Sequence, residues 1–186
     1  MSRFNFTKTF LEGVFIVEPK PICDERGYFE RYFCAQDFKE IGIHKPIVQI
    51  NHSKTMGKGA VRGIHFLAPP LCETKIVRCL KGAIYDVAVD LRADSPTFLQ
   101  YFGTELNEEN GKYLAIPNGV GHAFQTLSDE TEILYLVTEY FNAEADRTLN
   151  ALDSTINIKW QLEIGIMSQK DKNAPCVDQN FKGLKV

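Results

Sequence analysis

The chain has 186 residues, of which 44% are hydrophobic and 24% charged, a balance typical of a globular protein. Its net charge of −3 gives no reason to expect nucleic acid or an anionic membrane surface as a partner, and no hydrophobic run is long enough to span a membrane. The five cysteines are too irregularly spaced for a disulfide framework or a zinc site, so we predict a protein of the reducing cytoplasm.

Short strand-like runs follow one another along the chain, each ended by glycine, proline, asparagine or aspartate. In chain order, the predicted strands are Val14–Pro19, Val48–Ser53, Gly59–Phe66, Glu73–Leu80, Ala83–Leu91, Leu99–Leu106, Tyr113–Ile116, His122–Leu127 and Glu132–Tyr140. Helices are predicted only at Ala35–Ile41 and near the C-terminus. This spacing indicates an all-β sandwich or barrel, and the lack of repeats or linkers predicts one domain over residues 1–186.

Four polar side chains interrupt strand faces that otherwise suit the interior of a barrel. Period-two alternation places Lys75 on the same face as Val77, and it places Tyr135 between two apolar neighbours on its own strand. His65 and His122 lie on similar faces. A buried tyrosine or histidine is often only a hydrogen-bonded core residue, and that interpretation stays open for each one alone. A buried lysine rarely lacks a purpose, so the four together favour an acid–base set in one cavity.

The segment Pro117–His122 is similar to the second half of the metal-binding pattern of cupin barrels. The first half, a His-x-His pair, is missing, because none of the four histidines has that spacing. Lys75 also brings a positive charge into the same cavity, which disfavours a divalent ion. We therefore predict a cavity without metal and without any other cofactor.

A series of motifs, in the same order and over nearly the whole chain, carries a resemblance to a known family. They are Asp24–Phe29, Gln49–Ser53, Arg62–Phe66, Lys75–Arg78, Asp86–Arg92, Ser95–Phe98, Ile116–Phe124, Ile158–Trp160 and Met167–Asp171. Through them the chain resembles the dTDP-4-dehydrorhamnose 3,5-epimerase family. The resemblance implies a double-stranded β-helix, that is, a cupin-type jelly-roll barrel with a few short helices, usually assembled as a homodimer.

The resemblance also implies an epimerase reaction, in which a proton next to a C4 keto group is removed and returned to the opposite face. By position, His65 is expected to be the general base and Asp171 to hold its imidazole. Tyr135 is expected to be the acid on the other side of the sugar. Lys75 is expected to stabilise the enolate oxygen, with His122 beside it. These roles agree with the chemistry, since a fixed positive charge in a dry cavity favours enolate formation.

The implied ligand is a nucleotide-diphosphate sugar, most simply a dTDP-linked 4-keto-6-deoxyhexose. Its diphosphate is expected to meet basic side chains, namely Arg62, Arg26 and Lys170, because guanidinium forks pair well with phosphate oxygens. Further substrate-binding positions implied by the family are Gln49, Asn51, Phe29 and Asp146. Simple alternation turns Arg62 to the face opposite His65, so a bulge or a position at the barrel mouth is needed to bring both to one site.

Two departures from the family concern the ligand. Arg31 stands where the family commonly has an acidic residue, and Leu67 stands where it often has glutamine. They leave open the nucleotide base, the keto sugar, and whether C3, C5 or both carbons are inverted.

Two alternative functions are weighed against the epimerase. A 3,4-ketoisomerase of the same barrel is expected to lack the combination of His65, Lys75, Tyr135 and Asp171. A non-catalytic sugar-nucleotide-binding cupin is expected to keep Arg62 and lose that acid–base set. The set is intact in this chain, which favours the epimerase.

Overall fold

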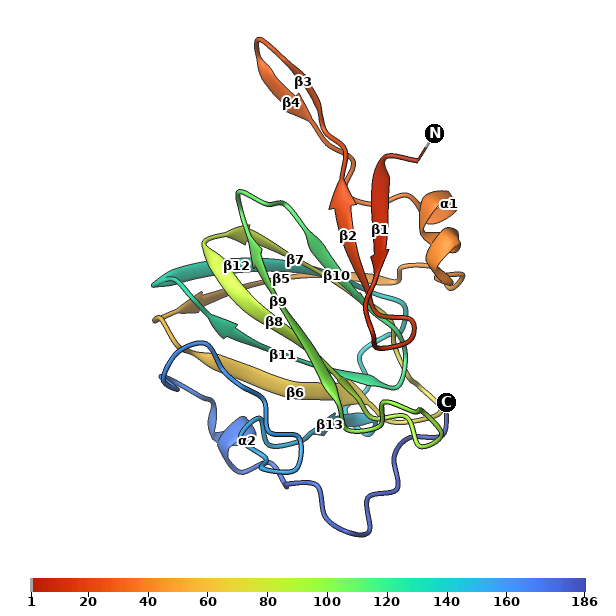
Figure 1. Cartoon of the computed structure of the whole chain (residues 1–186), viewed down its shortest axis with the longest axis vertical. Helices are drawn as coiled ribbons and strands as arrows, with labels where there is room; N and C mark the ends of the chain where they lie inside the picture. Colours follow the sequence, from red (N-terminus) through yellow and green to blue (C-terminus); the bar gives the residue numbers. More distant parts are fainter. Residues whose placement is uncertain (1) are drawn as a thin grey trace.

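Two antiparallel sheets packed face to face form the cupin-type jelly roll of this chain (Figure 1), as seen in a computed structural model that describes residues 2–186. The strands are β1 (Phe4–Lys8), β2 (Phe15–Pro19), β3 (Ile22–Asp24), β4 (Gly27–Phe29), β5 (Gln49–Met56), β6 (Val61–Leu67), β7 (Lys75–Lys81), β8 (Ala83–Asp90), β9 (Tyr101–Asn107), β10 (Tyr113–Ile116), β11 (Val120–Thr126), β12 (Glu130–Val137) and β13 (Asp146–Thr148). Helix α1 (Ala35–Phe38) continues into the 3-10 helix η1 (Lys39–Ile41), and α2 (Gln169–Lys172) lies near the C-terminus.

Strand order places β5 at the edge of one sheet and β6 next to the edge of the other. The six-stranded sheet runs β1-β2-β10-β7-β12-β5, and the five-stranded sheet runs β13-β6-β11-β8-β9. The space between the sheets is filled by alternate strand residues, including Val77, Cys79, Ile84, Leu114 and Ile133. Because side chains alternate along a strand, this apolar set fixes which of the polar residues face inward.

The outer faces of both sheets are covered by other parts of the chain. Phe38 of α1 packs with Phe4, Ile76 and Tyr113 on the outside of the six-stranded sheet. The long segment after β13 runs beneath the five-stranded sheet (Figure 1) and buries apolar residues there, such as Leu149. Both sheets are therefore covered on two sides, which explains why so many strand residues are apolar on both faces.

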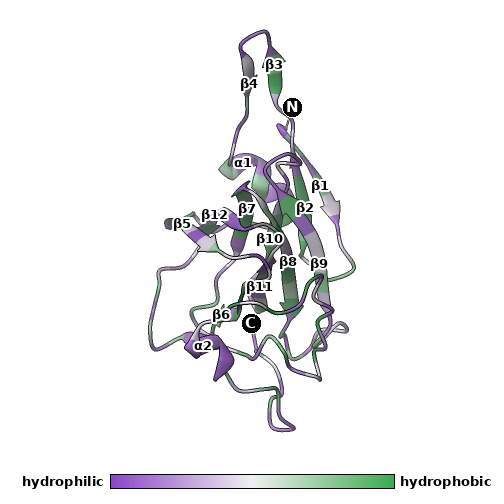
Figure 2. Cartoon of the chain, turned by 90° about the vertical axis from the view of Figure 1, so that its left-hand side faces the viewer, coloured by the Kyte–Doolittle hydropathy of each residue, from purple (hydrophilic) through white to green (hydrophobic). Residues whose placement is uncertain are grey.

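The β3–β4 hairpin stands away from the two sheets (Figure 1 and Figure 2). Just after it, the carboxylate of Glu30 forms an ion pair with Arg78 of β7, and both side chains are at most 7% exposed. Arg78 also donates to the hydroxyl of Tyr113 at 2.7 Å and lies over the ring of Tyr32 at 4.4 Å. This buried pair, with its further contacts to two tyrosines, fixes the base of the hairpin on the outer face of the sheet.

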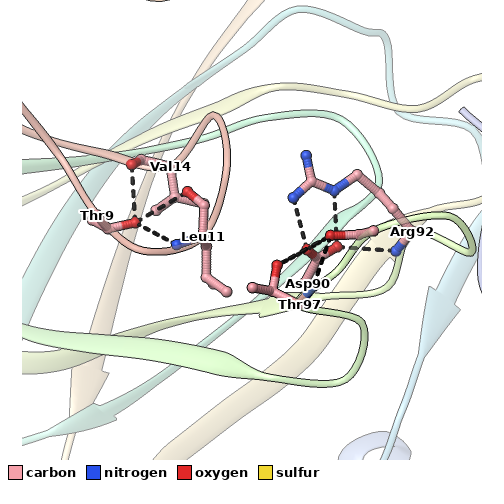
Figure 3. Close-up of polar contacts among 7 residues, drawn as sticks. Thr9, Leu11, Val14, Asp90, Arg92 and Thr97 are labelled. Carbon is pink, nitrogen blue, oxygen red and sulfur yellow. Dashed lines mark hydrogen bonds and ion pairs between the residues drawn. The ribbon is translucent and has the colours of Figure 1, made fainter.

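A second polar network closes the turn after β8 (Figure 3). The buried carboxylate of Asp90 accepts hydrogen bonds from the guanidinium of Arg92 at 2.8 and 2.7 Å, and from the hydroxyls of Ser95 and Thr97 at 2.5 and 2.6 Å. Burial alone would raise its pKa, but these bonds lower the pKa of Asp90 to about 2. The backbone next to this turn pairs with Leu184, so the network also supports the docking of the C-terminal segment.

The nine predicted strands all exist, with ends that shift by a few residues. The predicted helix at Ala35–Ile41 coincides with α1 and η1, and the C-terminal helix is α2. Strands β1, β3, β4 and β13 were not predicted. Within residues 2–186, no helix is long and apolar enough to cross a membrane.

Candidate active site

Arg62 and His65 lie on one face of β6 because the strand carries a bulge. The register with β11 pairs His65 with His122 and Arg62 with Phe124, so two residues of β6 oppose one residue of β11 between these pairs. The extra residue offsets the strict alternation of the strand. Both side chains accordingly line one cavity of about 390 Å³. Of the two arrangements that the sequence allowed, a bulge or a position at the barrel mouth, the structure has the bulge.

His65 is held by a buried carboxylate. A ring nitrogen of His65, Nε2, lies 2.6 Å from Oδ1 of Asp171, whose side chain is only 3% exposed. Ser168 caps α2 by accepting a hydrogen bond from the backbone N–H of Asp171 at 3.0 Å, which fixes the carboxylate. Burial opposes ionisation, yet the bonds to His65 and Ser168 keep the pKa of Asp171 below its usual range. Because a carboxylate only accepts, the other ring nitrogen of His65 is the basic one.

His122 forms a second histidine–carboxylate pair behind the first. It lies opposite His65 in the β6–β11 ladder, is 8% exposed, and has Nε2 at 2.6 Å from Oδ1 of Asp86. Asp86 is fully buried on β8, and its Oδ2 has no hydrogen-bond partner in the described structure. His122 lines neither the 390 Å³ cavity nor the second cavity around His65, so it lies behind His65 rather than at the cavity wall.

Lys75 and Tyr135 lie on the opposite wall, which is formed by the six-stranded sheet. In the β7–β12 ladder Tyr135 pairs with Val77, and Val137 pairs with Lys75. The ammonium of Lys75 lies 2.7 Å from Oε1 of Glu73. Burial is the main cause that raises the pKa of the Tyr135 hydroxyl, and the negative charge of Glu73 raises it further. Tyr135 is therefore held in its protonated form, the form that can donate a proton.

A second cavity of about 220 Å³ brings the two walls together around His65. It is lined mainly by predicted site residues and their neighbours: Gln49, Asn51, His65, Phe66, Leu67, Glu73, Lys75, Tyr135, Val137, Phe141, Asp146 and Lys170. His65 and Lys170 also line the 390 Å³ cavity that contains Arg62. The two cavities thus meet at His65. This arrangement suits a ligand with a sugar at one end and an anionic group at the other.

Asp146 and Lys170 are joined in an ion pair, with Nζ and Oδ2 2.5 Å apart. The sequence predicted both as separate substrate-binding residues, and the structure makes each the partner of the other. By contrast, Arg62 has no carboxylate partner within residues 2–186, and its Nη2 donates only a long bond, 3.4 Å, to the carbonyl of Lys54. Arg62 is therefore the basic side chain at the cavity that is free for an anion.

Arg26 and Phe29 lie on the β3–β4 hairpin and line neither cavity of their own chain. Arg26 is 85% exposed and forms an ion pair with Asp24 at 2.6 Å. Phe29 is 62% exposed. The structure thus separates these two predicted residues from the rest of the predicted site.

Sequence reasoning missed two carboxylates at the site, Glu73 and Asp86. Glu73 shares the face of Lys75 two residues further along, so the sequence contained a local signal for it. Asp86 needs the β8–β11 register to meet His122, and that register cannot be read from spacing alone.

Residues 2–186 contain no group of three or more His, Cys, Asp or Glu side chains that could hold a metal ion. The absence of a functional metal stays a prediction.

Comparison with known proteins identifies the family of this chain. Residues 8–179 match the family model described as dTDP-4-dehydrorhamnose 3,5-epimerase. The chain belongs to this family. A family member named dTDP-4-dehydrorhamnose 3,5-epimerase from Shigella flexneri is 41% identical over 91% of this chain and 93% of its own. One of that name from Methanothermobacter thermautotrophicus is 41% identical over 97% and 98%. Family membership makes the chain an isomerase of the carbohydrate-epimerase type.

A solved structure from the family has the same fold. The dTDP-6-deoxy-D-glucose-3,5-epimerase of Legionella pneumophila, solved in complex with dTDP-4-keto-L-rhamnose, is 35% identical to this chain. The match covers 98% of each chain and has a TM-score of 0.91. The cupin-type fold implied by the sequence motifs is therefore confirmed.

Proposed function

We propose that the chain epimerises a dTDP-linked 4-keto-6-deoxyhexose at both C3 and C5. The observation that carries the proposal is the position of His65 and Tyr135. They line one cavity but come from different sheets, His65 from β6 and Tyr135 from β12. Inversion needs a base and an acid on opposite faces of the carbon, and two facing sheets supply them.

The chemistry can be followed at a single carbon. The basic nitrogen of His65 takes the proton from the carbon next to the C4 ketone, and the electron pair moves onto the keto oxygen as an enolate. The Lys75 ammonium stabilises that oxygen with its positive charge. Tyr135 then donates its proton to the opposite face and the ketone re-forms. To complete the cycle, His65 releases the proton that it took to solvent, and Tyr135 regains a proton from solvent. No oxidant, reductant or cofactor is consumed.

The diphosphate is assigned to the 390 Å³ cavity, where Arg62 is free to pair with it. Lys170 adds positive charge where the two cavities meet, although Asp146 already partners it. Gln49 and Asn51 line the sugar-sized cavity with polar groups, and Leu67 contributes an apolar wall. Gln49 is itself fixed, because its side-chain oxygen accepts a 2.6 Å hydrogen bond from the backbone of Phe141.

The test is an exchange experiment. The protein is incubated in D₂O with dTDP-4-keto-6-deoxyglucose, and proton NMR follows the C3 and C5 signals. Deuterium at both carbons together with inverted products supports the proposal. Exchange at C3 alone would reduce the function to single-site epimerisation. A ketone that moves to C3 would indicate the 3,4-ketoisomerase, and tight binding without exchange would indicate a non-catalytic binding protein.

We further propose that the working form is a homodimer in which the β3–β4 hairpin reaches the cavity of the partner. Support comes from exposed apolar side chains on the hairpin, on edge strand β5 and beside the cavity: Ile22, Tyr28, Phe29, Tyr32, Ile50, Met56, Tyr140 and Phe141. Exposed apolar side chains on a hairpin and on an edge strand are typical of an interaction surface. In a dimer of this kind, Arg26 and Phe29 would join a site that they do not reach within one chain.

Mixing two inactive variants tests the composite site. In a heterodimer of Arg26→Ala and His65→Asn chains, one site keeps both wild-type residues. With random exchange in a two-fold symmetric dimer, about a quarter of the wild-type sites are restored. Failure to regain activity after subunit exchange, confirmed by light scattering and mass spectrometry, would place Arg26 outside the partner's site.

The proposed location is the cytoplasm, in the pool of nucleotide sugars. All five cysteines are free in the structure, and Cys72 and Cys79 are buried apart from any partner thiol. Free thiols at such positions are typical of a reducing compartment. Fractionation of the native host and detection of the protein with an antibody would test this.

A further inference from the structure

Glu73 is a carboxylate inside the sugar cavity that the reaction scheme above does not use. It lies two residues before Lys75, the first residue of β7, and it lines the same cavity as His65 and Tyr135. Its carboxylate contacts the Lys75 ammonium at 2.7 Å, and the two side chains are 12% and 13% exposed. Both charges are thus largely removed from water.

A carboxylate at this place opposes the chemistry unless it has a purpose. The ligand is anionic, and the reaction builds negative charge on the keto oxygen. A buried negative group disfavours both, and partial burial of a carboxylate has its own desolvation penalty. Asp146 and Lys170 already balance each other, so the positive charge that Glu73 offsets in this cavity is that of Lys75.

The contact with Lys75 supplies one reason. Lysine carries its charge on a flexible four-carbon chain, and the ammonium has three donors. One donor is taken by Glu73, so the ammonium is held at one point of the wall while two donors remain for the ligand. Chemistry is sensitive to such placement, because misplacement of a catalytic group by about 1 Å can lower a rate by about 100-fold.

The neighbourhood of Tyr135 supplies a second reason. The charged and titratable groups that line the cavity together with Tyr135 are Glu73 and Lys75, from β7 and the residues before it, His65 of β6, Asp146 of β13 and Lys170 of α2. Arg62 of β6 also acts on the Tyr135 hydroxyl through its charge. Burial does most to keep the phenol protonated, Glu73 adds to it, and Arg62 acts in the opposite direction. Removing the charge of Glu73 would therefore make the phenolate easier to form.

We propose that Glu73 is a positioning residue for the epimerisation, whose carboxylate fixes the Lys75 ammonium beside the keto oxygen and presents negative charge toward the Tyr135 hydroxyl. The inference rests on the proposed function, since it assigns Glu73 to the same site. It explains why a carboxylate is retained in a cavity for an anionic ligand.

The first test compares Glu73→Gln with the control Glu132→Gln. Glu132 of β12 is also paired, with His52 of β5 at 3.1 Å, but it lines neither cavity. For Glu73→Gln we expect kcat to fall about tenfold with KM within about twofold, because the diphosphate contacts are intact and only Lys75 loses its anchor. In the pH profile of kcat, the decline on the basic side (the basic limb) should move to lower pH, because the Tyr135 phenolate forms more easily without the charge of Glu73. The control should match wild type.

Glu73→Asp provides the matched charge-retaining variant. It keeps the negative charge near Tyr135 but shortens its reach to Lys75. We expect the basic limb to stay near its wild-type pH while kcat remains reduced. A Glu73→Gln variant with wild-type kcat and pH profile, or a Glu73→Asp variant whose basic limb shifts as far as that of Glu73→Gln, would overturn the proposal.

The second test does not depend on activity. Protein labelled with ¹³Cζ-tyrosine is titrated by NMR, and the Tyr135 signal is assigned by its absence in Tyr135→Phe. The Tyr135 signal of Glu73→Gln should titrate at lower pH than that of wild type and of Glu132→Gln. Identical titrations would overturn the proposal. If wild type lacked epimerase activity, the proposed function would fail on its own, while this titration would still report whether Glu73 acts on Tyr135.

Discussion

Arg62 and His65 are three residues apart on β6 and yet face the same side, because the strand bulges between their partners Phe124 and His122 on β11. A regular strand would turn residues three apart to opposite faces. The bulge thus brings a free guanidinium and the carboxylate-bound imidazole to neighbouring parts of one site. Bulges often occur beside active sites, where they redirect a side chain.

This relationship predicts that Arg62 governs affinity rather than chemistry. Arg62→Ala removes a charge-assisted phosphate contact of about 1.5–3 kcal/mol, which corresponds to an increase in KM of about 10- to 100-fold. We expect kcat to change little, because His65 and its Asp171 partner are untouched. Steady-state kinetics with the dTDP-sugar measures both constants. Arg147→Ala, an exposed arginine on β13 that lines neither cavity, is the control. An unchanged KM in Arg62→Ala would remove Arg62 from the site.

A second prediction concerns metal. Since neither the sequence pattern nor residues 2–186 supply a group of metal ligands, activity should survive dialysis against a strong chelator. The measurement is the initial rate before and after dialysis, with elemental analysis of the dialysed protein. Loss of activity that a single divalent ion restores would contradict it.

Much of the fold was predictable because the central strands carry a clear alternation. On β7, Val77 and Cys79 face the interior while Ile76 and Arg78 face outward, and the sequence shows the same period. Strands β3 and β4 gave no such signal, since all six of their residues are exposed. Their pairing depends on a tight two-residue turn rather than on burial.

The site was predictable where its residues carry their own signal. Lys75 stood out because an inward lysine needs an explanation, and Tyr135 shared an apolar face. The pairing of His65 with Asp171 joins residues 106 apart, and it came from the family resemblance, since no local pattern specifies it. The ion pair between Asp146 and Lys170 was not predicted, because it depends on how distant parts of the chain pack in three dimensions.

A third prediction links Asp90 to acid stability. Its folded pKa of about 2 lies below the unfolded value of about 3.9, so the folded state favours the carboxylate. Ionised Asp90 therefore contributes stability above about pH 4, of about 2 kcal/mol, and the contribution disappears as the pH falls toward 2. Asp90→Asn should have a lower free energy of unfolding than wild type at pH 7. The difference between the two proteins should become smaller near pH 2.

Urea denaturation at several pH values measures this effect. Asp94→Asn, in the same turn but exposed, is the control and should follow wild type throughout. A constant difference between wild type and Asp90→Asn from pH 7 to pH 2 would mean that the carboxylate charge is not what stabilises the turn.

A fourth prediction separates the base from the acid, beginning with the base. His65→Asn leaves the cavity without its proton acceptor, so no enolate forms and exchange with D₂O should fall at every carbon. Loss of a general base typically lowers a rate by about 10²–10⁴-fold. Asp171→Asn should lower exchange as well, but less, because the imidazole remains while its fixed orientation is lost. NMR of the recovered substrate measures both effects.

Tyr135→Phe should separate exchange from inversion. The variant keeps His65, the Lys75–Glu73 pair and most of the cavity shape, because only one hydroxyl is removed. His65 can still take the proton and return it to the same face, so deuterium enters the substrate while its configuration is retained. Chiral analysis of the deuterated product distinguishes this from inversion. If exchange and inversion fall equally, Tyr135 is required for enolate formation itself. If inversion continues at the wild-type rate, another group on the six-stranded sheet is the acid and Tyr135 is a core residue, which its inward position between Ile133 and Val137 would also explain.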